Sequence, residues 1–197
     1  MKEKIILIGG GGHCKSCIDV IEQHGRYTIA GIVDAPDKKQ QNVLGYSVIG
    51  SDADLEKLIG AFSNVLITLG QIKSSVRRIE LFNYLKQLGA NFPAIQSPLA
   101  YVSPHAFVAE GTIVMHQALI NAGASVGRNC IINTKALVEH DAVIEDHCHI
   151  STGVIVNGGV KIGSGSFFGS GAVSKEYASI PANSFIKANS LYRKKDE

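Results

Sequence analysis

Large apolar residues recur at every sixth position through the second half of the chain. The repeat begins at Val102 and keeps its phase as far as Phe168. Its positions are Val102, Val108, Val114, Ile120, Val126, Ile132, Val138, Ile144, Ile150, Val156, Ile162 and Phe168. The residue four places after each of them is never larger than valine. No α-helix has a six-residue period. The pattern therefore predicts a parallel β-helix, in which three short strands form one triangular coil and the coils stack.

The length of the repeat predicts the length of this β-helix. Three hexads make a coil of 18 residues, so the 72 residues from Val102 to Val173 predict four coils. After Val173 the pattern weakens and Pro181 appears. We therefore expect the stretch from Tyr177 to Leu191 to cover the end of the β-helix rather than to continue it.

The first half of the chain begins with a different pattern, a β-loop-α-β unit. Ile5 to Ile8 is an apolar strand, and four glycines, Gly9 to Gly12, follow it. Cys14 to Gln23 has the spacing of an amphipathic helix, and Tyr27 to Val33 reads as a second strand that ends at Asp34. We expect a Rossmann-like α/β fold for this half.

Further signals complete the α/β half. Ser51 and Asp54 form a predicted capping pair before a short helix. The remaining predicted elements are a buried strand Asn64 to Leu69, an amphipathic helix Ser74 to Leu88 with Arg77, Arg78 and Lys86 on its polar side, and a short strand Asn91-Phe92. Pro93 and Pro98 mark a linker. The sequence thus predicts two domains, residues 1–95 and residues 96–197.

Composition narrows the classes of function. The chain has 197 residues and a formal net charge of +2, so the large basic surplus of a nucleic-acid-binding protein is absent. No apolar run is long enough to cross a membrane, and Met1 leads straight into a strand without a signal peptide. We expect a cytoplasmic protein with reduced thiols. Cys130 and Cys148 occupy the small-residue position of the repeat, whereas Cys14 and Cys17 have a spacing also found in redox or metal sites.

The glycine-rich loop suggests a phosphate site. Glycines let a backbone approach a ligand closely, and the start of the following helix offers free N–H groups and a positive dipole end. Asp34 stands where an acidic residue can accept from a ribose hydroxyl. Cys14 replaces the third glycine of the dinucleotide pattern, which favours a nucleotide-linked sugar over a nicotinamide or flavin cofactor. A tight turn without a ligand is the alternative, and His13 either caps the helix or contacts phosphate.

Histidines in the repeat stand out because the core does not require them. His140 lies beside Asp141 in a turn between two faces, and His147 and His149 follow. An imidazole titrates near neutral pH and suits a general base, and a neighbouring carboxylate can orient it. The alternatives are solvated surface histidines or a metal site. A third ligand with the usual zinc spacing is missing, so we expect no metal.

The chain resembles a known family at these residues. A glycine-rich α/β unit followed by hexapeptide repeats, with Asn133 to Asp141 and His149 to Gly153, resembles bacterial sugar O- and N-acetyltransferases. Relatives include the sialic acid O-acetyltransferases and the N-acetyltransferases that act on UDP-4-amino sugars. The resemblance implies a left-handed parallel β-helix, a homotrimer, and acetyl-CoA bound between neighbouring chains.

The resemblance also implies roles for individual residues. It makes His140 the general base and Asp141 its orienting neighbour. It puts Asn133 and His149 near the acetyl group, with His149 as a donor to the thioester oxygen, and Gly158 and Ser170 along the coenzyme. It puts the nucleotide sugar against Gly11, Gly12, His13, Asp34 and Gly70. One departure concerns the C-terminal turn, where Lys187 to Ser190 stands in place of the glycine and proline that relatives carry.

The function we expect is transfer of acetyl from acetyl-CoA to the amino group of a UDP- or dTDP-linked 4-amino sugar in surface glycan synthesis. O-acetylation of sialic acid or another sugar is one alternative, and a longer acyl donor is another. From a different class, the chain could be a catalytically inactive nucleotide-binding scaffold trimer. The partners we expect are the nucleotide sugar and two further copies of the chain, with no nucleic acid and no membrane.

Overall fold

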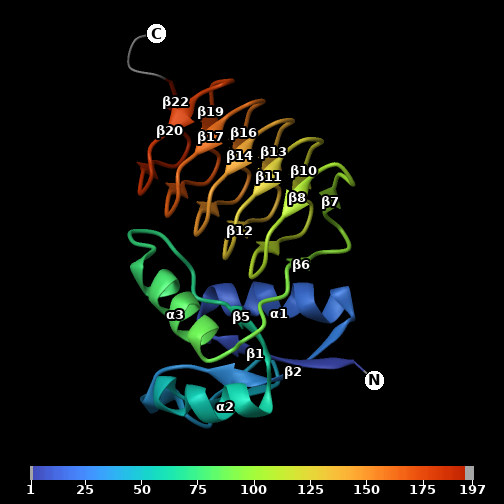
Figure 1. Ribbon diagram of the computed structural model, residues 1–197, viewed down its shortest axis with the longest axis vertical. Coiled ribbons are helices and arrows are strands. Elements are labelled where there is room, and N and C mark those ends of the chain that lie inside the picture. The colour runs from blue at the N-terminus through green and yellow to red at the C-terminus, as the bar shows by residue number, and fades with distance from the viewer. Residues whose placement is uncertain (1, 194–197) are drawn as a thin grey trace.

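A computed structural model describes residues 2–193, which form a small α/β unit below a column of stacked coils (Figure 1). The α/β unit is built on a five-stranded sheet with the order β3-β4-β2-β1-β5. Only β3 runs antiparallel to its neighbour. The elements of this unit are β1 (Glu3–Ile8), α1 (Gly12–His24), β2 (Tyr27–Val33), η1 (Pro36–Lys38), β3 (Asn42–Val43), β4 (Tyr46–Gly50), η2 (Asp52–Asp54), α2 (Leu55–Ala61), β5 (Asn64–Ile67) and α3 (Val76–Gln87).

Both faces of this sheet are covered by helices, which explains why its central strands are almost continuously apolar. Successive side chains of a strand point to opposite faces. Ile5 and Leu7 of β1 pack with α1, whereas Ile6 and Ile8 pack with α2 and α3. The strands β2 and β5 lie on either side of β1 and run parallel to it. The loops that follow these three strands therefore lie at the same edge of the sheet. Open α/β sheets bind ligands at such an edge.

The second half is a parallel β-helix, as the six-residue period predicts. Its strands form three parallel sheets, β22-β19-β16-β13-β10-β7, β20-β17-β14-β11-β8 and β21-β18-β15-β12-β9-β6. The strand bounds are β6 (Ile95–Gln96), β7 (Tyr101–Val102), β8 (Phe107–Val108), β9 (Ile113–Val114), β10 (Leu119–Ile120), β11 (Ser125–Val126), β12 (Ile131–Ile132), β13 (Leu137–Val138), β14 (Val143–Ile144), β15 (His149–Ile150), β16 (Ile155–Val156), β17 (Lys161–Ile162), β18 (Phe167–Phe168), β19 (Val173–Ser174), β20 (Ser179–Ile180), β21 (Phe185–Ile186) and β22 (Leu191–Tyr192).

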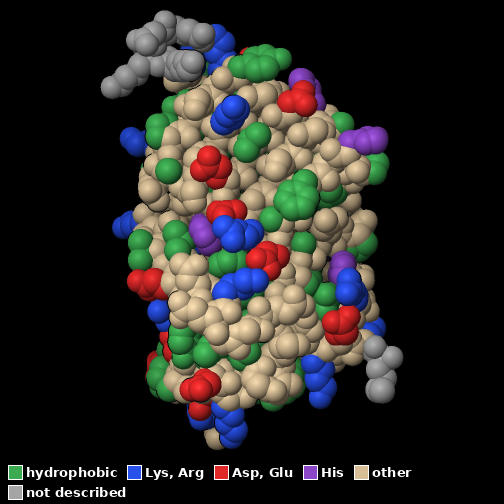
Figure 2. Space-filling view, in the orientation of Figure 1, with side chains coloured by type: hydrophobic (Ala, Val, Ile, Leu, Met, Phe, Trp, Pro, Cys, Tyr) green, Lys and Arg blue, Asp and Glu red, His purple; other side chains and the backbone are tan. Residues whose placement is uncertain are grey.

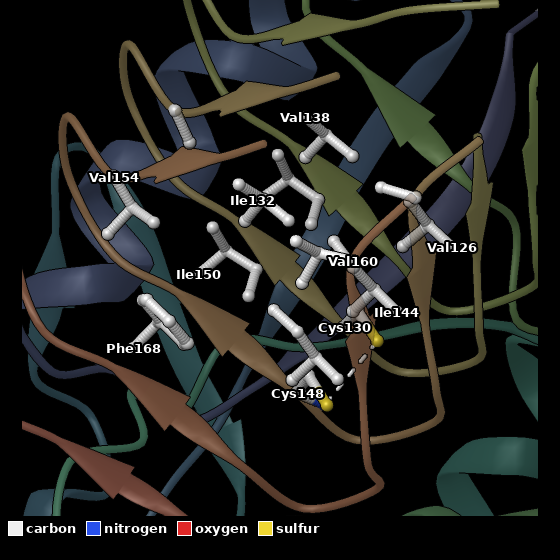
Figure 3. Close-up of a cluster of buried hydrophobic side chains, with 14 of the residues drawn as sticks. Val126, Cys130, Ile132, Val138, Ile144, Cys148, Ile150, Val154, Val160 and Phe168 are labelled. Carbon is white, nitrogen blue, oxygen red and sulfur yellow. Dashed lines mark hydrogen bonds between the residues drawn. The ribbon is translucent and has the colours of Figure 1, made fainter. Parts of the chain in front are cut away.

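The repeated apolar positions point into the column and fill it (Figure 3). Cys130 and Cys148 lie one above the other in this core, and both are free thiols. The backbone N–H of Cys148 lies 3.4 Å from the sulfur of Cys130. Contact with Cys130 and burial both raise the pKa of the Cys148 thiol. These two cysteines are packing residues, as their place in the repeat predicts.

The C-terminal end of the β-helix differs from the prediction. The stretch from Tyr177 to Leu191 continues the coils through β20, β21 and β22 instead of covering them. The phase breaks at one residue, Ser174, which takes the place of an aliphatic side chain and is fully buried. Its hydroxyl accepts a hydrogen bond of 2.9 Å from the backbone N–H of Asn157, so a polar atom is satisfied inside the core.

The two units are packed together along one face of the β-helix. Ile113, Met115 and Ile131, which point outward from the sheet that contains β6, belong to the same buried cluster as α1. The predicted strand Asn91-Phe92 is wrong, because Asn91 makes only an isolated bridge to Asn64. Phe92 instead packs on Phe82 of α3 with ring centroids 4.5 Å apart.

Charged side chains of both signs are interspersed on the face of the molecule seen in Figure 2. No helix within residues 2–193 is long and apolar enough to span a bilayer.

Candidate active site

The turns of the β-helix line up in three corners, and two of them carry the candidate residues. The Asn133 corner comprises the turns that follow β12, β15 and β18, and it includes Thr134, Thr152 and Ser170. The His140 corner comprises the turns that follow β13, β16 and β19, and it includes Asp141 and Gly158. The outward surface between these two corners is the sheet that contains β7 and β22.

A large open pocket lies where the α/β unit meets the Asn133 corner. Its cavity has a volume of about 660 Å³. We call it the acceptor pocket, and its lining is Gly11, Gly12, His13, Ser16, Thr68, Leu69, Gly70, Gln71, Ile72, Asn133, Thr134, His149 and Thr152. Six residues that the sequence nominated for two different ligands thus share one pocket: Gly11, Gly12, His13, Gly70, Asn133 and His149.

A chain of hydrogen bonds orders the polar wall of the acceptor pocket. The backbone N–H of Thr134 donates to Asn133 Oδ1 over 2.8 Å, so the Asn133 amide nitrogen faces His149 Nε2 at 3.2 Å. His149 Nδ1–H donates to the carbonyl oxygen of Gln71 over 2.6 Å. Burial lowers the pKa of His149 to about 4, so the ring is neutral and its Nε2 carries a lone pair.

This arrangement changes the expected role of His149. A neutral ring that donates through Nδ1 has no hydrogen left for a thioester oxygen. The Asn133 amide has two hydrogens and gives one to His149, so its second hydrogen can be donated to a ligand. Of these two residues the donor is therefore Asn133, and His149 fixes the direction in which that amide points.

His13 also lines this pocket, and its ring is neutral. Burial is the main cause that lowers its pKa to about 3, and the ring lies 6.3 Å from that of His149. Within residues 2–193 its Nε2 has no hydrogen-bond partner. The helix α1 starts at Gly12 without a side-chain cap, and a Cβ atom added at Gly11 or Gly12 would meet nothing within 4 Å. The first turn of α1 is thus open to a ligand.

His140 lies at a different corner and is paired with a carboxylate. Its Nδ1 faces Asp141 Oδ2 at 2.9 Å, so the carboxylate accepts the Nδ1 hydrogen and leaves the Nε2 lone pair free. This hydrogen bond raises the pKa of His140, and the charges of Asp141 and Glu139 add to the effect. The side chain is 55% exposed.

Gly158 makes room for this imidazole. A Cβ atom at Gly158 would lie 2.7 Å from His140 Nε2 and 2.8 Å from its Cε1, so only glycine leaves the ring in place. Ser170, also nominated for the coenzyme, lies instead at the Asn133 corner, where its hydroxyl lies 2.9 Å from that of Ser151.

Asp34 lies outside the acceptor pocket. Its Oδ2 accepts from the backbone N–H of Gly10 over 2.8 Å, and its Oδ1 accepts from that of Ala35 over 2.7 Å. Lys38 Nζ lies 3.2 Å from the same carboxylate. These three donors hold its pKa below the usual value although burial opposes them. Asp34 therefore fixes the shape of the glycine-rich loop.

Sequence reasoning missed the residues that join the two units behind the pocket. Gln71 Nε2 donates to the carbonyl oxygen of Gly165, and the carbonyl of Gln71 accepts from His149. Arg78 is buried, with 2% of its surface exposed, and hydrogen-bonds across to Asn129. The prediction that Arg78 lies on the polar side of its helix is wrong. Among residues 2–193, no group of three or more His, Cys, Asp or Glu side chains is arranged to hold a metal ion.

Comparison with known proteins agrees with this architecture. Residues 4–85 match the family model of the PglD N-terminal domain, and residues 141–173 match that of the bacterial transferase hexapeptide repeats. No curated protein sequence matches the chain.

Solved structures match over nearly the whole chain. Perosamine N-acetyltransferase from Caulobacter crescentus, in complex with CoA and GDP-perosamine, is 32% identical, with a TM-score of 0.91 over 97% of this chain and 89% of that one. The acetyltransferase domain of PglB from Neisseria gonorrhoeae is 29% identical, with a TM-score of 0.90 over 98% of this chain and 92% of that one. The same domain with acetyl coenzyme A is 30% identical, with a TM-score of 0.86 over 96% and 90%.

The fold and these matches define a class, the acyltransferases built on a left-handed hexapeptide β-helix. The chain belongs to the bacterial sugar acetyltransferases of that class, which join a PglD-type α/β unit to the β-helix. The family and the fold expected from the sequence are thereby confirmed.

Proposed function

We propose that the protein transfers acetyl from acetyl-CoA to the amino group of a nucleotide-linked amino sugar, and that His140 is the general base. One observation carries the proposal most directly. A pocket open to the start of α1 is lined by His13 and by the amide donor Asn133, and a second corner offers a histidine whose free nitrogen is made basic by a carboxylate. The related structures with CoA and GDP-perosamine, and with acetyl coenzyme A, support both substrates.

The open start of α1 suits the binding of the nucleotide sugar. The free N–H groups of the first turn of α1 and its dipole suit the diphosphate of a nucleotide sugar. Gly11 and Gly12 keep side chains away from that surface, and His13 lines the pocket beside it. The sugar would then extend towards Asn133, which brings its amino group to the wall where an acetyl group can be held.

A homotrimer is supported by the uncovered sheet between the two corners. The outward positions of this sheet are all apolar: Tyr101, Leu119, Leu137, Ile155, Val173 and Leu191. Tyr101 is 56% exposed and Leu191 is 50% exposed. If three chains pack these sheets around a threefold axis, the His140 corner of each chain lies beside the Asn133 corner of the next. One chain alone holds its acceptor pocket and its base at separate corners, so the site would be complete only between chains.

The chemistry proceeds by direct transfer. His140 Nε2 takes a proton from the sugar amine as its nitrogen forms a bond to the thioester carbonyl carbon. The carbonyl oxygen gains negative charge, which an Asn133 N–H can stabilise. The carbon–sulfur bond then breaks, and the CoA sulfur leaves as a thiol with the proton that His140 carried. All four cysteines are buried, so none is available as an acyl carrier.

The pH dependence of kcat/KM provides a prediction. A protonated imidazole cannot accept the amine proton, so activity is lost as pH falls through the pKa of His140. Asp141 raises that pKa, so the acid limb should lie above the ordinary histidine value of about 6.5. In Asp141→Asn the limb should move to lower pH, because the carboxylate that stabilises the cation is gone. Asp37→Asn is the control. It removes a carboxylate in η1, far from His140 in the sequence, and should leave the acid limb at the same pH.

The function itself is tested by thiol release. Acetyl-CoA would be incubated with a panel of UDP-, dTDP- and GDP-linked amino sugars and with free sialic acid, and the products would be identified by mass spectrometry. We expect thiol release with a nucleotide amino sugar and an acetyl group on its nitrogen. Release with sialic acid alone would show the O-acetyltransferase alternative, and failure to bind CoA would support the inactive scaffold. Both substrates are cytoplasmic metabolites, so we place the reaction in the cytoplasm, as a step of surface glycan synthesis.

A further inference from the structure

A second cavity lies at the same edge of the α/β sheet as the glycine-rich loop. Its volume is about 220 Å³, and we call it the base pocket. Its lining is Ile8, Gly9, Val33, Asp34, Ala35, Asp52, Leu69, Arg77 and Leu81. Leu69 also lines the acceptor pocket, and the glycine-rich loop contributes to both cavities. A ligand that crosses this loop can therefore occupy both.

We propose that the base pocket holds the base of the nucleotide sugar and that the Asp52–Arg77 pair selects guanine. This inference rests on the proposed function, since it concerns the other end of the same acceptor. It narrows the substrate class from nucleotide-linked amino sugars in general to those linked to guanosine diphosphate.

The pocket has the composition that a nucleobase needs. Its walls are mostly aliphatic, with Ile8, Val33 and Leu81 among them, and can pack against the flat faces of a base. Asp52, at the start of η2, and Arg77, on α3, reach towards each other from two sides and form an ion pair. Their side chains are 54% and 56% exposed, so both can turn towards a ligand without leaving a buried charge behind.

Asp34, the third charged residue in the lining, cannot bind the base in the same way. Both oxygens of Asp34 already accept backbone hydrogen bonds, from Gly10 and Ala35, and its side chain is only 12% exposed. Recognition of the polar edge of a base therefore falls to the Asp52–Arg77 pair. Arg77 Nη1 also lies 3.6 Å from Glu80 Oε2, so a second carboxylate neighbours this guanidinium.

The donors and acceptors of this pair match the edge of guanine. Guanine presents a carbonyl oxygen beside two neighbouring N–H donors, and a carboxylate can accept from both donors while a guanidinium donates to the oxygen. Uracil and thymine present one N–H between two carbonyl oxygens, so the second oxygen of Asp52 would face an acceptor. Cytosine and adenine offer one amino group beside an acceptor nitrogen and leave Asp52 with a single contact.

The test compares nucleotide binding by calorimetry on the full-length protein. GDP, UDP, CDP and ADP are titrated into the wild type, Asp52→Asn and the control Glu56→Gln, an exposed carboxylate on α2 outside the pocket. We expect GDP to bind most tightly to the wild type. Asp52→Asn should weaken GDP binding by roughly 10- to 100-fold, since a paired base contact is lost, and should change UDP binding by less than about twofold. Glu56→Gln should leave all four affinities unchanged.

Several results would overturn the assignment. Binding of UDP as tight as that of GDP, or an equal loss for both nucleotides in Asp52→Asn, would show that this pair does not read guanine. The thiol-release assay separates that failure from a failure of the proposed function. If a UDP-linked amino sugar is acetylated and Asp52→Asn has no effect on its KM, only the choice of base is wrong. If no nucleotide amino sugar releases thiol, the proposed function is wrong as well.

Discussion

Replacing His140 by alanine is expected to lower kcat by about 10²- to 10⁴-fold, the contribution that a positioned general base makes. The imidazole is more than half exposed, so its removal should cost little stability. Acetyl-CoA affinity and melting temperature should therefore stay close to wild type. Initial rates of thiol release with the best acceptor, together with a thermal melt, measure both parts.

A matched control is available at the same corner. His105 is also exposed and lies in the turn that follows β7, but within residues 2–193 it forms no pair with a carboxylate like that of His140 with Asp141. His105→Ala should keep full turnover. If His140→Ala kept kcat within about twofold of wild type, the assignment of the base would be wrong, since a general base contributes far more than that.

Replacing Arg78 by methionine should have the largest effect on stability. Arg78 Nη1 donates to the carbonyl oxygens of Ile67 and Leu69 at 3.0 and 2.6 Å. Its Nη2 donates to the carbonyl and the side-chain oxygen of Asn129 at 2.9 and 2.7 Å. Burial lowers the pKa of this guanidinium to about 10, so it stays charged at neutral pH.

Methionine fills similar space but leaves these four oxygens without their donor. A loss on the order of 3 kcal/mol follows from unsatisfied buried acceptors, which corresponds to a fall of roughly 10 °C in melting temperature for a chain of this size. Arg77→Met is the control for stability. Arg77 is the neighbour of Arg78 in the sequence, but its side chain is 56% exposed, so this substitution should change the free energy of unfolding by no more than about 0.5 kcal/mol. Equal melting temperatures for the two variants would contradict the structural role of Arg78.

The six-residue period predicted the β-helix because the core of the β-helix needs an apolar side chain at the same position of every hexad. Such a period can be recognised within a short stretch of sequence. Every aliphatic position from Val102 to Phe168 is confirmed as facing the column. The period failed at its end for a specific reason. Ser174 is the first polar residue at one of the large apolar positions of the repeat, but Ile180 and Ile186 continue the six-residue period. The hydrogen-bond partner of the Ser174 hydroxyl is the backbone N–H of Asn157, 17 residues earlier. A single satisfied polar residue is not the end of a repeat.

The site residues that sequence reasoning missed depend on contacts between distant parts of the chain. Arg78 shares the spacing of Leu81, Phe82 and Leu85, which put it on the buried stripe of α3. Its charge made it look exposed, and the oxygens that satisfy it come from β5 and from Asn129, 51 residues away. Gln71 is another such case, because its partners lie in the β-helix 78 and 94 residues later.

The sequence could single out these glycines and paired histidines because the core does not need them, and their roles stay predictions. Their grouping was not readable from the chain. The acceptor pocket joins the start of α1 to Asn133 and His149, and the tautomer of His149 depends on a carbonyl in the other unit. The separation of His140 from this pocket required the corners of the folded β-helix, and it leads to the claim that the active site lies between chains.

Mixed assemblies test that claim most directly. A His140→Ala chain and an Asn133→Ala/His13→Ala chain would be coexpressed with different tags, purified through both, and assayed for thiol release with acetyl-CoA and the preferred nucleotide amino sugar. Each variant alone should be nearly inactive. Purification through both tags removes the pure trimers, and in every remaining mixed trimer one interface of three pairs an intact base with an intact pocket, so the mixture should recover about a third of the wild-type rate. A mixture no more active than the sum of the two variants would contradict a site shared between chains.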